Sequence, residues 1–273
     1  AVAGWAIGAA RRIPFIFELG DLWPTSIAAV GAMKRGIALR MMEVVELFLY
    51  RRAAKVAALT QAFKRNLIGR DISADKVAVV LNGVDLPRYS PRARDAALAE
   101  KWGLTGKFVI GYVGTHGMAH GLINVLDAAE ILAPMEGIRF LFAGAGAERD
   151  MLIDAVQARG LENIRFLPAQ PKDAMPAVWS LCDVALVHLR DLPAFAEVIP
   201  SKIFEAMAMG LPILLAAPKG EAAEIIEGHG AGRWVAPEAP EELAAASLAA
   251  APAHSREVQA REMLAVFEAA VQL

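Results

Sequence analysis

The stretch from residue 108 to residue 121, FVIGYVGTHGMAHG, decides how this chain folds. A mainly apolar run, 108–113, is followed by a loop with three glycines and two histidines that leads into a helical pattern. A short apolar run that ends in such a loop is typical of a buried strand in a parallel sheet. Outward from this stretch, short apolar runs alternate with helical periodicity, which predicts an α/β fold.

The strand–loop–helix unit recurs six times and predicts a complete doubly wound domain over residues 105–254. The predicted strands are 108–113, 138–143, 164–167, 184–188, 212–215 and 233–235. The predicted helices are 121–132, 148–159, 174–181, 200–209, 221–227 and 240–250.

The first part of the chain has the same pattern with fewer units. The predicted strands are 14–18, 56–59 and 77–81, with long helices between 25 and 52, a helix capped by Thr60, and a linker at 82–106 that carries a charged helix. We therefore expect two Rossmann-like, doubly wound parallel-sheet domains, 1–104 and 105–254, the first of them incomplete. A last helical segment, 255–273, is expected to pack back on the first domain.

Composition narrows the class of protein. Hydrophobic residues make up 56% of the 273 residues and charged residues 21%, which excludes a disordered chain. The single cysteine, Cys182, excludes an internal disulfide framework and favours a reducing compartment, so we expect the cytoplasm.

Charge is divided unequally along the chain. Residues 1–105 carry 16 basic and 9 acidic side chains, net +7, whereas residues 106–273 carry 12 and 21, net −9. The basic part can face anionic lipid or an anionic substrate, and ordinary solvated helix faces are the alternative. No nucleic-acid-binding motif is present, so we expect no nucleic-acid partner.

Two glycine-rich loops follow predicted strands, where open parallel sheets bind ligands. The loop from Gly114 to Gly121 can hold phosphate through backbone N–H groups, and a purely structural turn or a metal site at His116 and His120 are the alternatives. The run 143–149 begins like a dinucleotide-binding fingerprint, but Arg149 stands where the third glycine belongs. There we expect a tight turn that lines the pocket.

The strongest group of candidate residues lies in 197–212, EVIPSKIFEAMAMGLP. Pro200 suits the start of a helix and Gly210 its end, which places Lys202 in the first turn and Glu205 on the same face. Lysine is unfavourable at a helix N-terminus unless an anion lies there. The alternative is a solvated Lys–Glu pair.

Several motifs, in this order and spacing, resemble the retaining family 4 type of GT-B glycosyltransferases, in particular the members that build O-antigen and capsule. They are DLWP at 21–24, FLYRRA at 48–53, LNGVD at 81–85, GYVGTHG at 111–117, PSKIFE at 200–205 and the Glu197-x7-Glu205 spacing. The resemblance covers almost the whole chain. It also implies that relatives begin about three strands earlier, so the chain looks truncated at its N-terminal side.

The resemblance implies a role for each candidate residue. Glu205 binds the ribose of a nucleotide sugar, Glu197 contacts the donor sugar, and the loop with Ala169 faces the base. Relatives carry Arg and Lys on the diphosphate where Thr115 and His120 stand here, and a neutral threonine does not replace a guanidinium. Lys202 at the helix N-terminus, beside Ser201 and Gly114, is expected to supply the missing charge, and His120 is expected to add a hydrogen bond or a partial charge. Lys202 and Glu197 are the expected catalytic residues.

These inferences predict a glycosyltransferase that transfers a sugar with retention from a nucleoside diphosphate sugar to a saccharide or lipid-linked acceptor, in cell-surface polysaccharide or glycolipid synthesis. We expect no metal and no cofactor, because the chain has no DxD-type carboxylate pair. Peripheral contact with the inner face of the membrane would suit the basic first domain. The alternatives are a nucleotide-sugar epimerase of the same fold and a non-catalytic nucleotide-sugar-binding module.

Overall fold

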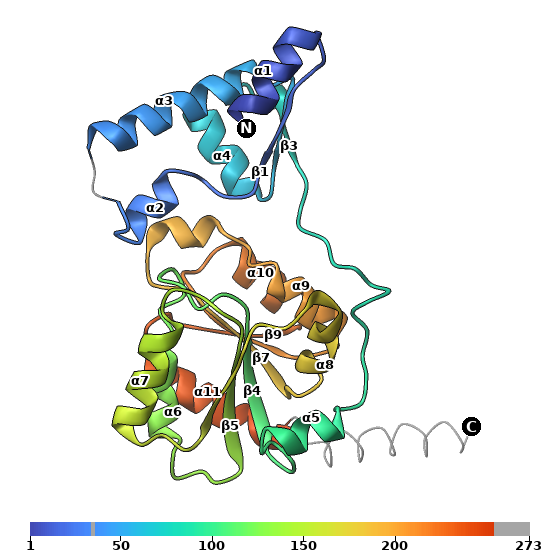
Figure 1. The fold of residues 1–273 in the computed structure, drawn as a ribbon, viewed down its shortest axis with the longest axis vertical. Coiled ribbons are helices and arrows are strands. Elements are labelled where there is room, and N and C mark those ends of the chain that lie inside the picture. Colours follow the sequence, from blue (N-terminus) through green and yellow to red (C-terminus); the bar gives the residue numbers. More distant parts are fainter. Residues whose placement is uncertain (34–35, 254–273) are drawn as a thin grey trace. The chain divides into compact units, whose positions relative to one another are not determined.

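The computed structural model describes residues 1–33 and 36–253, which form two compact units. The first unit comprises Ala1–Gly83, Leu192–Pro200 and Lys219–Glu224, and the second comprises most of the remaining residues. Each unit contains one parallel sheet (Figure 1). The predicted fold class, two parallel-sheet α/β modules, is confirmed.

The second unit is built on a six-stranded parallel sheet of order β6-β5-β4-β7-β8-β9. Its strands are β4 (Phe108–Val113), β5 (Ile138–Ala143), β6 (Ile164–Leu167), β7 (Val184–His188), β8 (Ile213–Ala216) and β9 (Gly232–Val235). In chain order this is the 3-2-1-4-5-6 arrangement of a doubly wound sheet. All six predicted strands are present, the first four with the predicted bounds.

The order of the strands fixes where the ligand edge lies. The central strand β4 pairs with β5 on one side and with β7 on the other, so that Gly111 is opposite both Leu141 and Ala185. The connections from β4 and β7 therefore leave in opposite directions. The topological switch point of this sheet lies at the loop that follows Val113.

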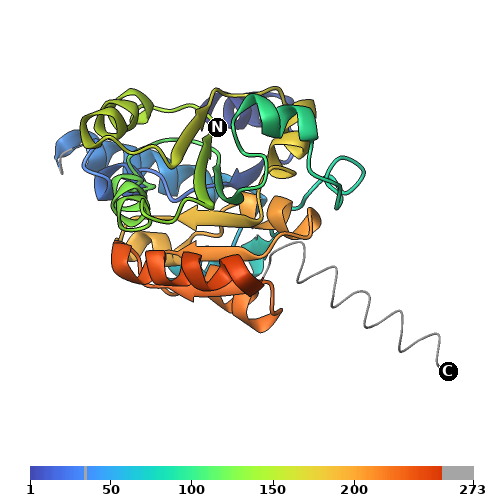
Figure 2. The ribbon, with the colours of Figure 1, turned by 90° about the horizontal axis from the view of Figure 1, so that it is seen from below.

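Helices cover both faces of this sheet, as the two perpendicular views show (Figure 1, Figure 2). They are α6 (Ile123–Ile131), α7 (Arg149–Arg159), α8 (Met175–Trp179), α9 (Lys202–Ala208), α10 (Glu221–Gly228) and α11 (Pro240–Ala253). Helix α11 packs on α6, and α9 packs on β7 and β8. Helix α9 begins two residues later than the predicted bound, because Ser201 occupies the N-cap position.

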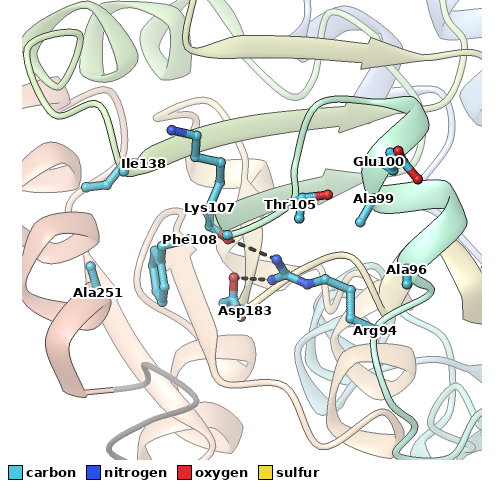
Figure 3. A pocket seen from close by; sticks show the side chains of 12 residues that line it. Arg94, Ala96, Ala99, Glu100, Thr105, Lys107, Phe108, Ile138, Asp183 and Ala251 are labelled. Atoms are coloured by element: carbon cyan, nitrogen blue, oxygen red, sulfur yellow. Dashed lines mark hydrogen bonds and ion pairs between the residues drawn. The ribbon is translucent and has the colours of Figure 1, made fainter.

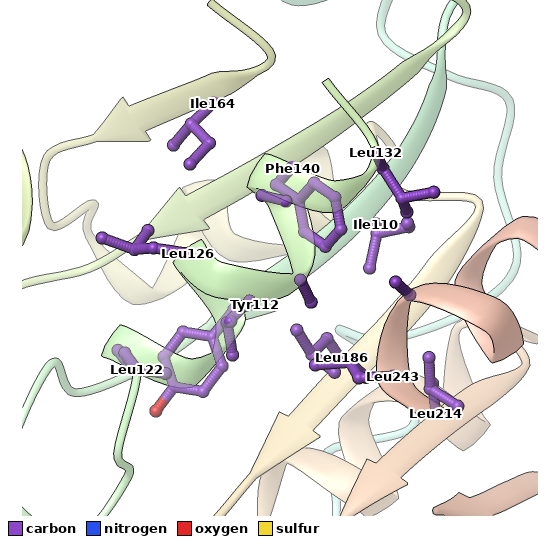
Figure 4. Packing of buried hydrophobic residues seen from close by; sticks show 14 of the residues in the cluster. Ile110, Tyr112, Leu122, Leu126, Leu132, Phe140, Ile164, Leu186, Leu214 and Leu243 are labelled. Atoms are coloured by element: carbon purple, nitrogen blue, oxygen red, sulfur yellow. The ribbon is translucent and has the colours of Figure 1, made fainter. Parts of the chain in front are cut away.

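An apolar core joins one face of the sheet to its helices (Figure 4). Ile110 and Phe140 from adjacent strands are fully buried together with Leu122 and Leu126 around α6. Full burial of a large apolar side chain stabilises a fold by about 1.5–3 kcal/mol. This core gives the strand ends that carry the candidate site a rigid support.

The first unit has a three-stranded parallel sheet, β1-β2-β3, with a smaller core. The strands are β1 (Ile16–Leu19), β2 (Lys55–Ala58) and β3 (Val77–Val79), and the helices are α1 (Val2–Arg11), α2 (Thr25–Ala29), α3 (Ile37–Arg52) and α4 (Gln61–Gly69). Thr60 caps α4 by accepting a hydrogen bond from the backbone N–H of Phe63, as its sequence position predicts. Helix α1 was not predicted from the sequence.

The structure divides the chain differently from the predicted boundary at residue 104. The segment after Gly83, with α5 (Ala96–Lys101), belongs to the second unit because Arg94 pairs with Asp183 and Pro91 lies against Gly210. The predicted helix at 255–273 lies outside the described residues. Within residues 1–33 and 36–253, no helix is both long and apolar enough to cross a bilayer.

Candidate functional site

The glycine loop after β4 lies directly beside the Lys202 side chain. Gly114 has a φ of 140°, and a Cβ at this residue would lie 2.8 Å from the Lys202 Nζ. Glycine is therefore required here both for the backbone conformation and for the close approach of the ammonium group. The structure brings Gly114 and Lys202 together as predicted, at the carboxyl edge of the second sheet.

The Lys202 ammonium group is buried without a hydrogen-bond partner among the described residues. Its Nζ lies 3.8 Å from the centre of the Tyr112 ring, a cation–π contact. Burial lowers the pKa of Lys202 to about 7, and nearby Glu205 opposes this shift. A buried cation without a paired anion is unfavourable, so this site is suited to an incoming negative charge.

The second glycine loop supports the first through backbone contacts. A Cβ at Gly144 would lie 2.0 Å from the Gly114 carbonyl oxygen, and one at Gly146 would lie 2.2 Å from that of His116. The backbone N–H of His116 donates to the Ala145 carbonyl at 2.9 Å. These glycines allow two loops to pack without side chains between them, in agreement with the expected tight turn.

Three histidines lie at or beside this loop and are held neutral by their surroundings. Burial, followed by the nearby charges of Arg149 and Lys202, lowers the pKa of His116 to about 4. Burial, followed by Lys202, lowers the pKa of His120 to about 3, so the partial charge expected of His120 is wrong and only a hydrogen bond remains open to it. The Nδ1 of buried His188 donates to the His120 carbonyl at 2.6 Å. No cluster of metal-ligand side chains occurs within residues 1–33 and 36–253.

The Glu205 carboxylate is oriented by a buried tryptophan. Trp179 donates from its Nε1 to Oε2 of Glu205 at 3.0 Å. Burial, and then the charge of Glu205, raises the pKa of Tyr89. Glu205 lies one helical turn from Lys202 on α9, and its charge raises the pKa of Lys202 against the effect of burial. Acceptor oxygens held in this way can bind ligand hydroxyls.

The other predicted donor-binding residues lie on loops at the same edge. Thr115 is exposed, and its carbonyl accepts from the Tyr112 hydroxyl at 2.7 Å. Ala169 is exposed in the loop after β6, and Ser201 is exposed immediately before α9. These three positions surround the carboxyl ends of the strands.

Glu197 belongs to the first unit, in the 3-10 segment Pro193–Glu197. Asn66 donates from Nδ2 to Oε2 of Glu197 at 3.2 Å, and the Thr60 hydroxyl donates to the Glu197 carbonyl at 3.0 Å. Burial raises the pKa of Glu197, whereas the Asn66 hydrogen bond and Arg65 lower it. Glu197 is thus a partly buried carboxylate fixed by residues of α4.

Sequence reasoning missed four residues that shape these sites: Tyr112, Trp179, Arg149 and Asn66. In the sequence, Tyr112 and Trp179 have the pattern of core aromatic residues. Their roles at the site appear only in the structure, where Tyr112 contacts Lys202 and Trp179 donates to Glu205. Arg149 interrupts a glycine fingerprint in the sequence. In the structure its guanidinium lies over the Phe166 ring, 5.9 Å from the ring centre, and its charge lowers the pKa of His116. No local sequence pattern marks Asn66 as a residue of the site.

A cavity of 920 Å³ lies at the opposite, amino edge of the second sheet (Figure 3). Lys107 and Phe108 at the start of β4 line it, together with the Arg94–Asp183 ion pair. Arg94 also donates to the Lys107 carbonyl at 2.9 Å. Because this edge carries none of the candidate residues, we place the functional site at the carboxyl edge.

Comparison with known proteins identifies the class. Residues 95–251 match the family of group 1 glycosyl transferases, and the chain belongs to that family. It is 32% identical over 159 residues to WcaI of Escherichia coli strain K12, a glycosyl transferase provisionally assigned to colanic acid biosynthesis, covering 57% of this chain and 38% of WcaI.

Two further comparisons extend over more of the chain. WbjE of Pseudomonas aeruginosa, described as a probable glycosyltransferase, is 30% identical over 247 residues, which cover 84% of this chain and 58% of WbjE. The chain therefore spans between about two fifths and three fifths of the length of these two relatives. Anabaena Alr3699/HepE, solved with UDP and glucose, has a TM-score of 0.75 at 24% identity, covering 91% of this chain and 64% of that one. This likeness confirms the predicted GT-B fold.

Proposed function

We propose that the second unit binds the diphosphate of a nucleotide sugar and that the protein transfers the sugar, with retention, to an acceptor. The single observation that carries this proposal is the Lys202 ammonium group, buried without a partner against Gly114. A diphosphate at this position would give the ammonium group its counterion. It would also accept hydrogen bonds from the backbone of the glycine loop.

The group 1 family membership and the relatives support the substrate class. HepE was solved with UDP and glucose, and WcaI is provisionally assigned to colanic acid synthesis. By this likeness we propose a nucleoside diphosphate sugar as donor and a cell-surface polysaccharide or glycolipid precursor as product. We place the reaction on the cytoplasmic side of the membrane.

Each charged group has a proposed task. Lys202 stabilises the negative charge that develops on the leaving diphosphate, a role in which fixed positive groups are most effective. Glu205, held by Trp179, accepts hydrogen bonds from the ribose hydroxyls. Glu197 positions the donor sugar. We assign no cofactor, since Lys202 supplies the charge that the leaving group needs.

The acceptor is proposed to be a saccharide or a lipid-linked saccharide. Helix α3 exposes the apolar side chains of Met41, Val44 and Phe48, and Arg52 lies over the Phe48 ring at 5.6 Å. An exposed apolar stripe beside basic side chains is suited to an anionic membrane surface. Peripheral binding there would bring the protein to a lipid-linked acceptor.

A thermal-shift screen with UDP, GDP, ADP and their sugar conjugates tests the proposal. We expect at least one nucleotide to raise the unfolding temperature of the wild type and of the control Lys101→Met, and to raise that of Lys202→Met much less. Lys101 is an exposed lysine on α5, so the control makes the same change from lysine to methionine outside the candidate site. An equal response of both variants would contradict the role of Lys202.

Analysis of products separates the proposal from its alternatives. Transfer with retention gives a glycoside with the anomeric configuration of the donor. An epimerase would release free epimerised nucleotide sugar without an acceptor. The longer relatives, supplied with the same nucleotide sugars and acceptors, serve as positive controls for transfer. If this protein binds nucleotide sugars but converts none of them in these assays, the result would favour the non-catalytic binding module.

A further inference from the structure

Two histidines connect the glycine loop of the second unit to the strand beside it. Strands β4 and β7 are neighbours in the sheet (Figure 1), and in such a sheet the ligand crevice lies between the loops that follow the strands at the switch point. His120 belongs to the loop after β4, whereas His188 is the last residue of β7. A contact between these residues therefore joins the two sides of the crevice.

The contact is made in both directions. The His188 Nδ1 lies 2.6 Å from the His120 carbonyl oxygen, and the His120 Nδ1 lies 3.4 Å from the His188 carbonyl oxygen. The first distance is short for an N–H···O hydrogen bond and the second is long, so His188 makes the stronger contact. The backbone N–H of Arg190 donates to the Ala119 carbonyl at 3.0 Å. Two consecutive carbonyls of the glycine loop are thus held from the end of β7.

The last glycine of the loop permits this close approach. Gly121 has a φ of 54°, and a Cβ at this residue would lie 2.9 Å from the Arg190 Cγ and 3.5 Å from the His188 Cε1. A larger residue would therefore press on both side chains and would be strained in its backbone. The space between the loop and β7 is filled by the contact itself.

The acceptor fixes the position of the ring proton on His188. A carbonyl oxygen only accepts hydrogen bonds, so Nδ1 must carry a hydrogen. Burial lowers the pKa of His188, although the hydrogen bond to His120 and the charge of Glu238 oppose this shift. The imidazole is therefore neutral at pH 7, with its single ring proton on Nδ1.

The hydrogen bond also sets the direction of a peptide group in the loop. The bond between His120 and Gly121 is a planar trans peptide, so its C=O and N–H point in opposite directions. Because the carbonyl is turned toward His188, the Gly121 N–H points away from that side chain. Among the described residues this N–H has no hydrogen-bond acceptor. It lies two residues before α6, where a free backbone N–H can bind phosphate.

We propose that His188 is a positioning residue of the nucleotide site: its Nδ1–H holds the His120 carbonyl and thereby keeps the loop from Gly114 to Gly121 in the conformation that binds the diphosphate. The inference rests on the proposed function and adds to it a residue that acts through the backbone of the loop. Without this donor the carbonyl would turn toward water or another donor, and the Gly121 N–H would turn with it.

Two substitutions at His188 separate the hydrogen bond from the packing of the side chain. The amide nitrogen of asparagine is as many bonds from the backbone as Nδ1 of histidine, so His188→Asn keeps a donor at this place. His188→Leu keeps a similar volume and removes the donor. The control is Asn163→Leu, because buried Asn163 donates to the Ala129 carbonyl at 2.7 Å and lies just before β6, at the amino edge of the sheet.

Calorimetry with UDP, GDP and ADP measures the role of His188 in binding, after circular dichroism and thermal unfolding have established that each variant folds. His188→Leu should weaken the binding of a nucleoside diphosphate about tenfold. His188→Asn should keep most of the affinity, and Asn163→Leu should lose stability but match the affinity of the wild type. Hydrogen–deuterium exchange of peptides that cover residues 114–121 should rise in His188→Leu and stay at the wild-type level in the other two variants.

NMR of the wild-type protein with ¹⁵N-labelled histidine tests the hydrogen bond without a substitution. Nδ1 of His188 should carry the ring proton at pH 7, and an unprotonated Nδ1 would overturn the inference even if His188→Leu did not fold. Unchanged exchange or unchanged affinity in folded His188→Leu would also overturn it, as would an equal loss of affinity in both His188 variants. If no nucleoside diphosphate binds the wild type, the proposed function fails and this inference fails with it, whereas equal binding by the wild type and His188→Leu refutes this inference alone.

Discussion

Replacement of Lys202 by methionine should make the protein more stable and weaken its binding of nucleotides. Methionine retains most of the apolar length of lysine and removes the ammonium group, which is buried without a partner beside Tyr112. An uncompensated buried charge destabilises the folded state. The same group would be stabilising once an anion lies against it, so stability and function are expected to change in opposite directions.

The pKa of Lys202 sets the magnitude of the stability effect. Burial lowers this pKa from 10.5 to about 7. At about 1.36 kcal/mol for each tenfold change in the protonation equilibrium, the difference corresponds to an upper bound of about 5 kcal/mol. Structural relaxation reduces such penalties, so we expect Lys202→Met to gain on the order of 2 kcal/mol at pH 7.

The sign of the pH dependence follows from the two pKa values. Below pH 7, Lys202 is protonated in both the folded and the unfolded state. Between pH 7 and about 10.5 the unfolded state keeps the proton that the folded state has lost, so the free energy of unfolding rises with pH. The gain from Lys202→Met should therefore have its full value below about pH 7, decrease between pH 7 and pH 10.5, and vanish near pH 10.5.

Thermal unfolding at pH 7 and pH 10 measures this effect. A gain of about 2 kcal/mol corresponds to an increase of about 4–8 °C in the unfolding temperature of a unit of this size. Lys101→Met controls for the loss of one positive charge. The reasoning is refuted if Lys202→Met is no more stable than the wild type at pH 7, or if its advantage is the same at both pH values.

Three further substitutions test other parts of the account. Gly114→Ala should cost about 1–3 kcal/mol of stability in thermal unfolding and should weaken nucleotide binding. The new Cβ would lie 2.8 Å from the Lys202 Nζ, and residue 114 has a φ of 140° that favours glycine. Unchanged binding would contradict the close packing of Gly114 and Lys202. Glu205→Gln should weaken nucleotide binding by about 1.5–3 kcal/mol, because charge-assisted hydrogen bonds to the ribose would be lost. Calorimetry measures this change, and an unaltered affinity would restrict Glu205 to a structural role. Asp183→Ala should cost about 3–5 kcal/mol of stability, because it leaves the largely buried Arg94 guanidinium without its carboxylate partner. It should not change the nucleotide affinity of the folded protein, and a loss of affinity would show that the amino edge of the sheet affects the site.

The sheet of the second unit could be predicted because its signals are local. Each strand is a short apolar run that ends at a glycine or polar loop, and four strands have the predicted bounds. Helix α1 escaped prediction because Val2–Arg11 contains Gly4 and Gly8, which weaken helical propensity. Gly8 lies against the Ile13 carbonyl oxygen and Phe15, a reason for glycine that the sequence does not reveal.

The candidate site could be predicted only in part. The spacing on one helix placed Lys202 and Glu205 together, and strand order brought the glycine loop to them. The burial of the Lys202 Nζ depends on Tyr112, which is 90 positions earlier in the sequence. The partner of Glu197 is Asn66, 131 positions away. Contacts between such distant positions leave no periodicity in a single sequence, so they appear only when the chain is folded.

The most direct test of the central claim is a crystal structure of the protein with the nucleoside diphosphate that gives the largest thermal shift. The account predicts that a diphosphate oxygen lies about 2.7–3.2 Å from the Lys202 Nζ, beside the loop that begins at Gly114. A nucleotide bound elsewhere, with the Lys202 ammonium group still buried without a partner, would contradict it.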